Sequence, residues 1–111
     1  MNISVRKAGD VTVVDLNGAL KLGGPEQAFR EAIEGLLDSG ILTIAVNLSG
    51  VNFLDSSGIG MLVRCHKTAS DRSGKLIFFA PTKMVKQTLK MVSLDKVMNL
   101  FEDETSALAA A

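Results

Sequence analysis

The feature that most constrains this chain is the joint at Phe53–Gly60, where an apolar run ends and a helical pattern begins with the residues FLDSSGIG. Asp and Ser are favoured at the start of a helix, because their side-chain oxygens accept a free backbone N–H. A helix start does not need Gly58 and Gly60, since each glycine costs roughly 1 kcal/mol against alanine inside a helix. The two glycines indicate that this turn has a role besides folding. We expect this corner to present a serine hydroxyl to another protein.

The residues before this joint predict a hairpin followed by a helix. Asn2–Arg6 alternates between polar and apolar residues, Val11–Leu16 is β-branched and apolar, and Ala8–Asp10 between them is a turn signal. Residues 18–24 are expected to form a loop, after which Pro25 suits the first position of a helix. The helix carries an apolar stripe, which consists of Ala28, Phe29, Ala32, Ile33, Leu36 and Leu37.

The next segments predict a buried strand and a second helix. Ile41–Leu48 is rich in Ile, Val and Leu without clean alternation, which is typical of a strand covered on both faces. Ser49–Asn52 interrupts this apolar run with polar residues before Phe53 and Leu54. After the joint, apolar side chains recur at helical spacing and are expected to face inward; they are Met61, Leu62, Cys65 and Ala69.

The last third of the chain predicts a strand, a helix, a short edge strand and a weak terminal helix. Lys75–Ala80 is apolar, and Val97–Phe101 could form the edge strand. Asp103–Ala111 opens with acidic residues, which favour a helix N-terminus, and is expected to fray at its alanines. In the helix that starts at Pro81, the residues expected inward are Val85, Leu89 and Val92, and Met91 is expected on or near that inward face.

Strands and helices therefore alternate after the first hairpin. This order predicts an α/β fold with a mixed, mostly parallel sheet of four to five strands that starts with an antiparallel hairpin and has helices packed on it. No linker or repeat divides the chain, so we expect a single domain over residues 1–111.

Composition narrows the possible functions. The 12 basic and 12 acidic residues cancel, so bulk charge predicts no nucleic-acid partner. The one Cys excludes an internal disulfide, and one Cys with one His disfavours a zinc site. No stretch has the ~18 apolar residues of a membrane span, and the N-terminus has no apolar core of signal-peptide length. We expect a cytoplasmic, monomeric protein without membrane insertion, metal or other cofactor.

A catalytic serine at the joint is disfavoured. A Ser-His pair needs the base within about 2.6–3.2 Å of the hydroxyl. The only histidine is His66, ten residues beyond Ser56 on the same predicted helix and therefore about 15 Å away. The chain also lacks the phosphate-binding glycine motifs, so Gly23-Gly24 is interpreted as a pair of loop residues that let the first helix turn away from the sheet. A small hydrolase or nucleotide-binding enzyme remains the least favoured alternative.

The order of elements and the motif together resemble the STAS domain, in particular the bacterial anti-sigma factor antagonists. The segment Val46–Gly60, read as VNLSGVNFLDSSGIG, carries the resemblance most strongly. Val85–Val97 is similar to the late helix and turn of that family. The resemblance covers nearly the whole chain and implies the STAS fold.

The resemblance also implies a switch. In that family the serine directly after the motif's Asp is phosphorylated by an anti-sigma factor that is also a serine kinase, which makes Ser56 the phosphoacceptor here. The unphosphorylated protein binds the anti-sigma factor and so releases the sigma factor, which it affects only indirectly. Phosphorylation blocks binding, and a serine phosphatase restores it. The implied partner-binding residues are Lys21, Gly23, Asp55, Ser57, Gly58, Ile59 and Gly60.

One segment departs from the family pattern. Members commonly carry a Gly-Glu-hydrophobe-Asp pattern after the second strand, whereas this chain reads Gly18-Ala19-Leu20-Lys21. The resemblance places that loop close to the partner, so the change bears on which partner binds. An alternative is therefore a STAS subunit of another assembly, such as an inner-membrane lipid-transport complex or a stress-sensing complex, without a phosphorylation switch.

Overall fold

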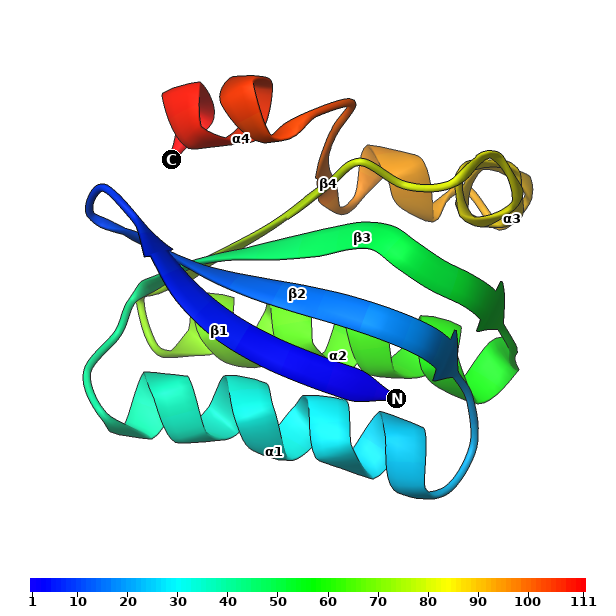
Figure 1. Ribbon diagram of the computed structural model, residues 1–111, viewed down its shortest axis with the longest axis horizontal. Helices are drawn as coiled ribbons and strands as arrows, with labels where there is room; N and C mark the ends of the chain where they lie inside the picture. Colours follow the sequence, from blue (N-terminus) through cyan, green and yellow to red (C-terminus); the bar gives the residue numbers. More distant parts are fainter.

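The computed structural model describes residues 1–111 and shows a five-stranded sheet with four helices (Figure 1). The strands are β1 (Asn2–Ala8), β2 (Val11–Leu20), β3 (Thr43–Leu54), β4 (Lys75–Phe79) and β5 (Asn99–Phe101). The helices are α1 (Gly24–Asp38), α2 (Ser56–Asp71), α3 (Lys83–Met91) and α4 (Glu104–Ala110), and a 3₁₀ turn, η1 (Leu94–Lys96), precedes β5. None of the helices is both long and apolar enough to cross a membrane.

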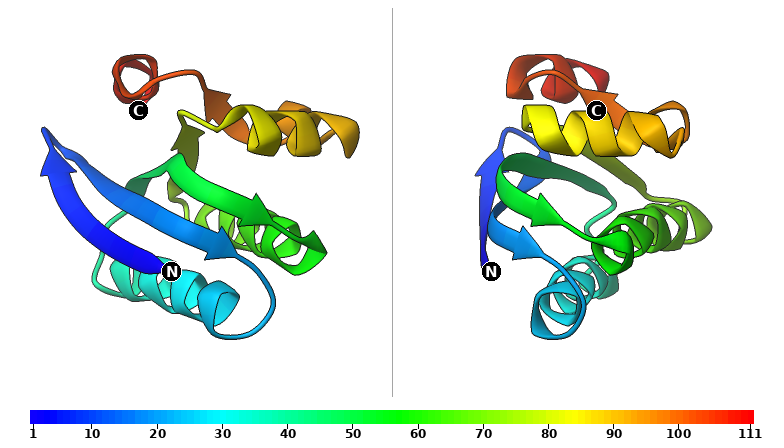
Figure 2. Two further views of the ribbon diagram at one scale, coloured as in Figure 1. Left: turned by 45° about the vertical axis from the view of Figure 1, so that its right-hand side comes forward. Right: turned by 90° about the vertical axis from the view of Figure 1, so that its right-hand side faces the viewer.

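The strand order is β1-β2-β3-β4-β5. β1 pairs with β2 in antiparallel fashion, and every later pair is parallel. The predicted α/β fold with an initial hairpin is therefore confirmed. Because the strands after β1 are parallel, their carboxyl ends lie at one edge of the sheet, where the connections to α1, α2 and α3 begin (Figure 2).

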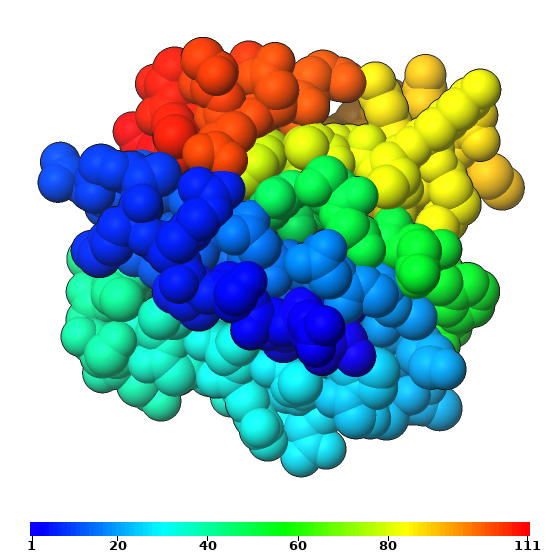
Figure 3. Space-filling view, in the orientation of Figure 1, coloured from blue at the N-terminus to red at the C-terminus, as the bar shows by residue number.

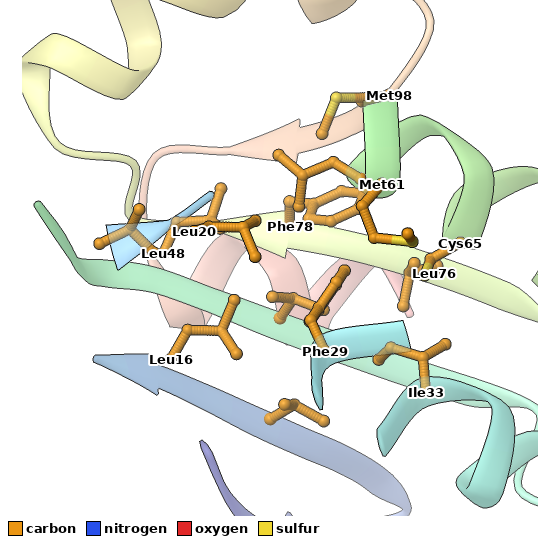
Figure 4. Packing of buried hydrophobic residues seen from close by; sticks show 14 of the residues in the cluster. Leu16, Leu20, Phe29, Ile33, Leu48, Met61, Cys65, Leu76, Phe78 and Met98 are labelled. Carbon is orange, nitrogen blue, oxygen red and sulfur yellow. The ribbon is translucent and has the colours of Figure 1, made fainter. Parts of the chain in front are cut away.

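The two faces of the sheet are covered unequally. α1 and α2 lie side by side on one face and bury a cluster of 20 residues, in which Phe29 and Ile33 meet Cys65 and the strand residues Leu16 and Phe78 (Figure 4). α4 covers the other face over a cluster of six, which includes Val13, Ile77 and Ala107. Alternate residues of β2 enter the two clusters, because successive side chains of a strand point to opposite faces.

Two predicted interruptions are strand in the structure. Gly18–Leu20, expected as loop, belongs to β2, and Ser49–Asn52 lies inside β3. The pairing of β2 with β3 survives because its register shifts after Asp15 and again after Gly18, so that bulges absorb the irregular residues. The polar residues therefore mark bulges in two continuous strands. As a result, β3 extends into the joint at Phe53–Gly60.

The prediction that Met91 and Val92 face inward is wrong. Met91 is 85% exposed and Val92 is 50% exposed. Val85 and Leu89 are the buried residues of α3, and Met91 lies about 200° round the helix from Leu89 at 100° per residue. The edge strand is confirmed but begins only at Asn99, and the terminal helix is confirmed with Ala107 fully buried.

Candidate functional site

The loop after β2 and the first turn of α2 meet at the carboxyl edge of the sheet. The register pairs Ala19 with Phe53 and Leu20 with Leu54, so the two strands end side by side. β2 leads into the loop that precedes α1, and β3 leads directly into α2 (Figure 2). The sheet thus brings together two segments that are more than thirty residues apart in the sequence.

Asp55 joins these two segments. Its Oδ1 accepts a hydrogen bond from the Gly58 backbone N–H at 2.8 Å and so caps α2. Its Oδ2 accepts a second one from the Leu22 backbone N–H at 3.1 Å. The N–H groups of Gly58 and then Leu22 hold the pKa of this carboxyl below its usual range, because they stabilise the ionised form. The cap was predicted, whereas the link to Leu22 depends on strand pairing and was not.

Ser56 presents a free hydroxyl at the start of α2. It is the first residue of the helix, its side chain is exposed, and its hydroxyl makes no hydrogen bond within the protein. Ser57 is half-buried, and its hydroxyl has no partner either. Because Asp55 performs the capping, the Ser56 oxygen stays available to a group that approaches from outside.

The two glycines of the motif have different surroundings. Gly58 is buried, and a Cβ there would lie 2.2 Å from the Leu20 carbonyl oxygen and 2.9 Å from Cδ1 of Leu54. Gly60 is exposed, and a Cβ there would meet nothing within 4 Å. Gly58 therefore lets α2 pack against β2, which is a structural reason for that glycine, whereas only Gly60 leaves open space at the surface. Ile59 is partly buried against the core.

The neighbouring loop contributes charge and apolar surface. Lys21 is exposed, and its carbonyl accepts the Glu26 backbone N–H at 3.1 Å, which ties the loop to the start of α1. Gly23 has a φ of 101°, in the region that favours glycine. Leu22 is 69% exposed and Phe53 is 50% exposed. The sequence analysis missed these two apolar residues, although Phe53 beside the inward Leu54 is a signal of outward orientation.

The side chains that would support serine chemistry lie elsewhere. His66 is on α2 with Ser56, ten residues later and therefore about 15 Å along the helix. Cys65 is buried as predicted, and burial raises the pKa of its thiol to about 12. A thiol with that pKa stays protonated at neutral pH and is a packing residue.

Comparison with known proteins places the whole chain in one family. The family model described as STAS domain matches residues 2–107. A relative from Paenibacillus polymyxa, named anti-sigma F factor antagonist, is 24% identical over 108 residues, which cover 97% of this chain and 92% of the relative.

Solved structures share the fold of this chain. An anti-sigma factor antagonist from Mycobacterium paratuberculosis has a TM-score of 0.85 and 24% identity, over 98% of this chain and 92% of that one. The Bacillus cell fate determinant SpoIIAA in its phosphorylated form has a TM-score of 0.73 and 21% identity, over 98% of each chain. Together with the five-stranded fold, the family match shows that this chain belongs to the STAS domain family.

Proposed function

We propose that this protein is an anti-sigma factor antagonist in a partner switch controlled by phosphorylation of Ser56. The observation that carries the proposal is the exposed Ser56 hydroxyl, which makes no hydrogen bond within the protein. The helix is capped by the preceding residue, Asp55, so the serine hydroxyl is not used for capping. The relative from Paenibacillus polymyxa carries the name of an antagonist, and SpoIIAA is known in a phosphorylated form. In this role the protein is a regulatory, cytoplasmic monomer and a kinase substrate.

The unphosphorylated corner is the binding surface for the anti-sigma factor. Leu22 and Phe53 supply exposed apolar area near the hydrogen bond between Leu22 and Asp55. Gly60 has no side chain and leaves open space at the helix surface, so a partner can approach closely. Exposed apolar surface beside a small polar centre is typical of a protein interface. Binding of the anti-sigma factor here would release its sigma factor.

The kinase partner has to bring its own base. Transfer of the γ-phosphoryl group of ATP forms the bond between Ser56 Oγ and phosphorus, breaks the bond to ADP and releases the hydroxyl proton. Asp55 is a poor acceptor for that proton, because both of its oxygens accept backbone N–H groups and its pKa is lowered. A serine phosphatase would reverse the modification by hydrolysis.

The phosphate acts at the interface and leaves the fold intact. It adds roughly −1.5 to −2 charges at pH 7. The N-terminus of α2 favours an anion by about 0.3–1 kcal/mol. Asp55 opposes it, by about 1 kcal/mol per unit-charge pair at 4 Å in water and up to ~4 kcal/mol at an effective dielectric of 20. Since these effects offset each other in part, the switch comes from the cost of burying a hydrated dianion against a partner without a matching cation.

Binding and phosphorylation assays with the cognate anti-sigma factor test the proposal. We expect Ser56→Ala to bind as tightly as the unmodified protein, and Ser56→Asp to bind at least about tenfold more weakly. After incubation with the kinase and ATP, mass spectrometry should find one phosphate on Ser56, and Ser57→Ala should still accept it. Equal affinity of wild type, Ser56→Ala and Ser56→Asp would contradict the switch.

A second candidate rests on the exposed Lys21, which stands where the family pattern has an acidic residue. The chain would then be a subunit of another assembly, such as a lipid-transport or stress-sensing complex, and the same corner would bind its partner constitutively. Phosphate on Ser57 alone, or on neither serine, together with partner binding that Ser56→Asp does not weaken, favours this alternative.

A further inference from the structure

The outer surface of α3 and of the turn that follows it exposes four large apolar side chains. Met84 is 38% exposed, Met91 85%, Val92 50% and Val97 56%. These are half of the large hydrophobic side chains that the whole protein exposes, and they lie within 14 residues of sequence. Contiguous exposed apolar surface marks an interaction site more often than single exposed residues do.

The exposed surface of α3 carries two separate stripes. Val85 and Leu89 face the core. At 100° per residue, Met84 and Met91 fall within about 20° of each other and about 10.5 Å apart along the axis. Lys83, Lys86 and Lys90 form the second stripe, centred about 120° round the helix from the methionines, with Gln87 between the two. The solvent side of α3 is therefore apolar along one line and cationic along another.

The lysines of this surface outnumber its acidic residues: Lys83, Lys86, Lys90 and Lys96 lie near Asp95 and Glu102, which leaves a surplus of two positive charges. Lys86 is paired with Glu102, whereas Lys83, Lys90 and Lys96 make no ion pair. Beside the lysine stripe lies a hollow of about 210 Å³, whose lining residues are Lys86, Lys90, Asp95, Leu100 and Glu102. Because the whole chain has a net charge of zero, this is a local surplus.

The surface shares no residue with the Ser56 corner. α3 is anchored by its Thr82 cap, whose hydroxyl lies 3.5 Å from the Val51 carbonyl oxygen. η1 follows the helix in the chain, and α3, yellow in Figure 3, lies at the upper right of the molecule in that view. Substitutions on α3 therefore change none of the residues at the Ser56 corner, so the two surfaces can be tested by separate variants.

We propose that the outer surface of α3 docks an amphipathic, acidic helix of a partner protein. Methionine side chains adapt to different apolar contacts, and the unpaired lysines would steer and orient a helix with carboxylates beside its apolar stripe. A membrane fits less well, because a helix that lies in a bilayer surface presents a wide apolar face, usually with aromatic anchors. Here the apolar stripe is narrow and α3 contains no aromatic residue.

An NMR titration tests this inference. The probe is a synthetic 18-residue helical peptide with Leu at positions i, i+4, i+7 and i+11 and Glu on one flank, added to the ¹⁵N-labelled full-length protein. We expect amide shifts confined to residues 82–97 and affinity that weakens as salt rises. The same peptide composition in scrambled order should bind at least about tenfold more weakly.

Two double variants and one control locate the contact. Met84→Ser with Met91→Ser, and Lys83→Glu with Lys90→Glu, should each weaken peptide binding at least about tenfold. The changed side chains are exposed, and an unchanged urea midpoint within a few tenths of a molar verifies folding. Leu22→Ser, at the other exposed apolar site, and Ser56→Asp should leave peptide binding unchanged, so this test stands apart from the switch.

Four results would overturn the inference. The first is equal binding of the ordered and scrambled peptides, and the second is a footprint at Ser56 instead of α3. The third is binding to phosphatidylglycerol vesicles that both double variants abolish while the peptide gives no shifts, which would assign the surface to a membrane. A concentration-dependent dimer lost in the methionine variant, without peptide binding, would assign it to a second copy of this chain.

Discussion

The helices α2 and α4 begin with the same capping geometry and lead to different surfaces. In α2 the Gly58 N–H donates to Asp55 Oδ1 at 2.8 Å, and in α4 the Ser106 N–H donates to Asp103 Oδ1 at 2.8 Å. In both cases a backbone N–H is the main cause that lowers the pKa of the capping carboxyl. The caps themselves therefore do not distinguish the two helix starts.

The residues that follow the caps do distinguish them. Glu104 opens α4 and accepts Arg6 Nη2 at 2.6 Å, while Arg6 Nε donates to Asp15 at 2.8 Å, so the first side chain of α4 holds the helix to the hairpin. Ser56 is the first residue of α2, and its hydroxyl makes no hydrogen bond within the protein. The two helix starts therefore share the cap and differ in the residue directly after it, which is bonded to the hairpin in α4 and has a free hydroxyl in α2.

Substitution of the two glycines gives the largest expected difference within α2. Gly58→Ala should lower the free energy of unfolding by about 1–3 kcal/mol, because its Cβ would overlap the Leu20 carbonyl 2.2 Å away. Gly60→Ala should raise it by about 0.5–1 kcal/mol, since its Cβ points into open space and alanine favours a helix. Urea unfolding measures both. Stabilisation by Gly58→Ala would contradict the packing reason for that glycine.

Truncation of the two caps separates stability from binding. Asp55→Ala and Asp103→Ala should each cost about 0.5–2 kcal/mol of unfolding free energy, because each removes one cap bond of the same length. Only Asp55→Ala also frees the Leu22 N–H and loosens the loop, so only this variant should weaken binding of the anti-sigma factor. Calorimetric titration checks this, and a comparable loss of binding in Asp103→Ala would show that the effect is general destabilisation.

Acid titration gives the smallest expected effect. A carboxyl whose pKa is lower in the folded state stabilises the protein above its unfolded pKa of about 3.8, and this stability disappears as pH falls through the folded value. Urea midpoints should therefore drop between pH 5 and pH 3 for wild type and drop less for Asp55→Asn and for Asp103→Asn. The pH dependence of the urea midpoint that remains in these variants comes from Asp15 and Glu104, because Arg6 lowers their pKa values. An unchanged slope in both Asn variants would refute the role of the caps.

The sequence was most informative where a single local rule decides the structure. The hairpin, the helix at Pro25 and the cap at Asp55 each follow from neighbouring residues, and all three are present. The prediction failed at Ser49–Asn52, where turn-like residues lie within β3 because β2 supplies paired hydrogen bonds across bulges. Met91 was misplaced against the helical period: with Val85 and Leu89 inward, Met91 lies about 200° round the helix from Leu89 and so faces solvent.

Local sequence determined which residues this chain offers at the start of α2: a capping Asp, a serine after it, and two glycines in the first turn. Tertiary structure decided what each of them does. Only the parallel pairing of β2 with β3 brings Leu20 against Gly58 and Leu22 within reach of Asp55, and neither contact lies within one segment of chain. The physical reason is range: caps and helical period act over a few residues, whereas packing and the free state of the Ser56 hydroxyl depend on what the sheet brings alongside.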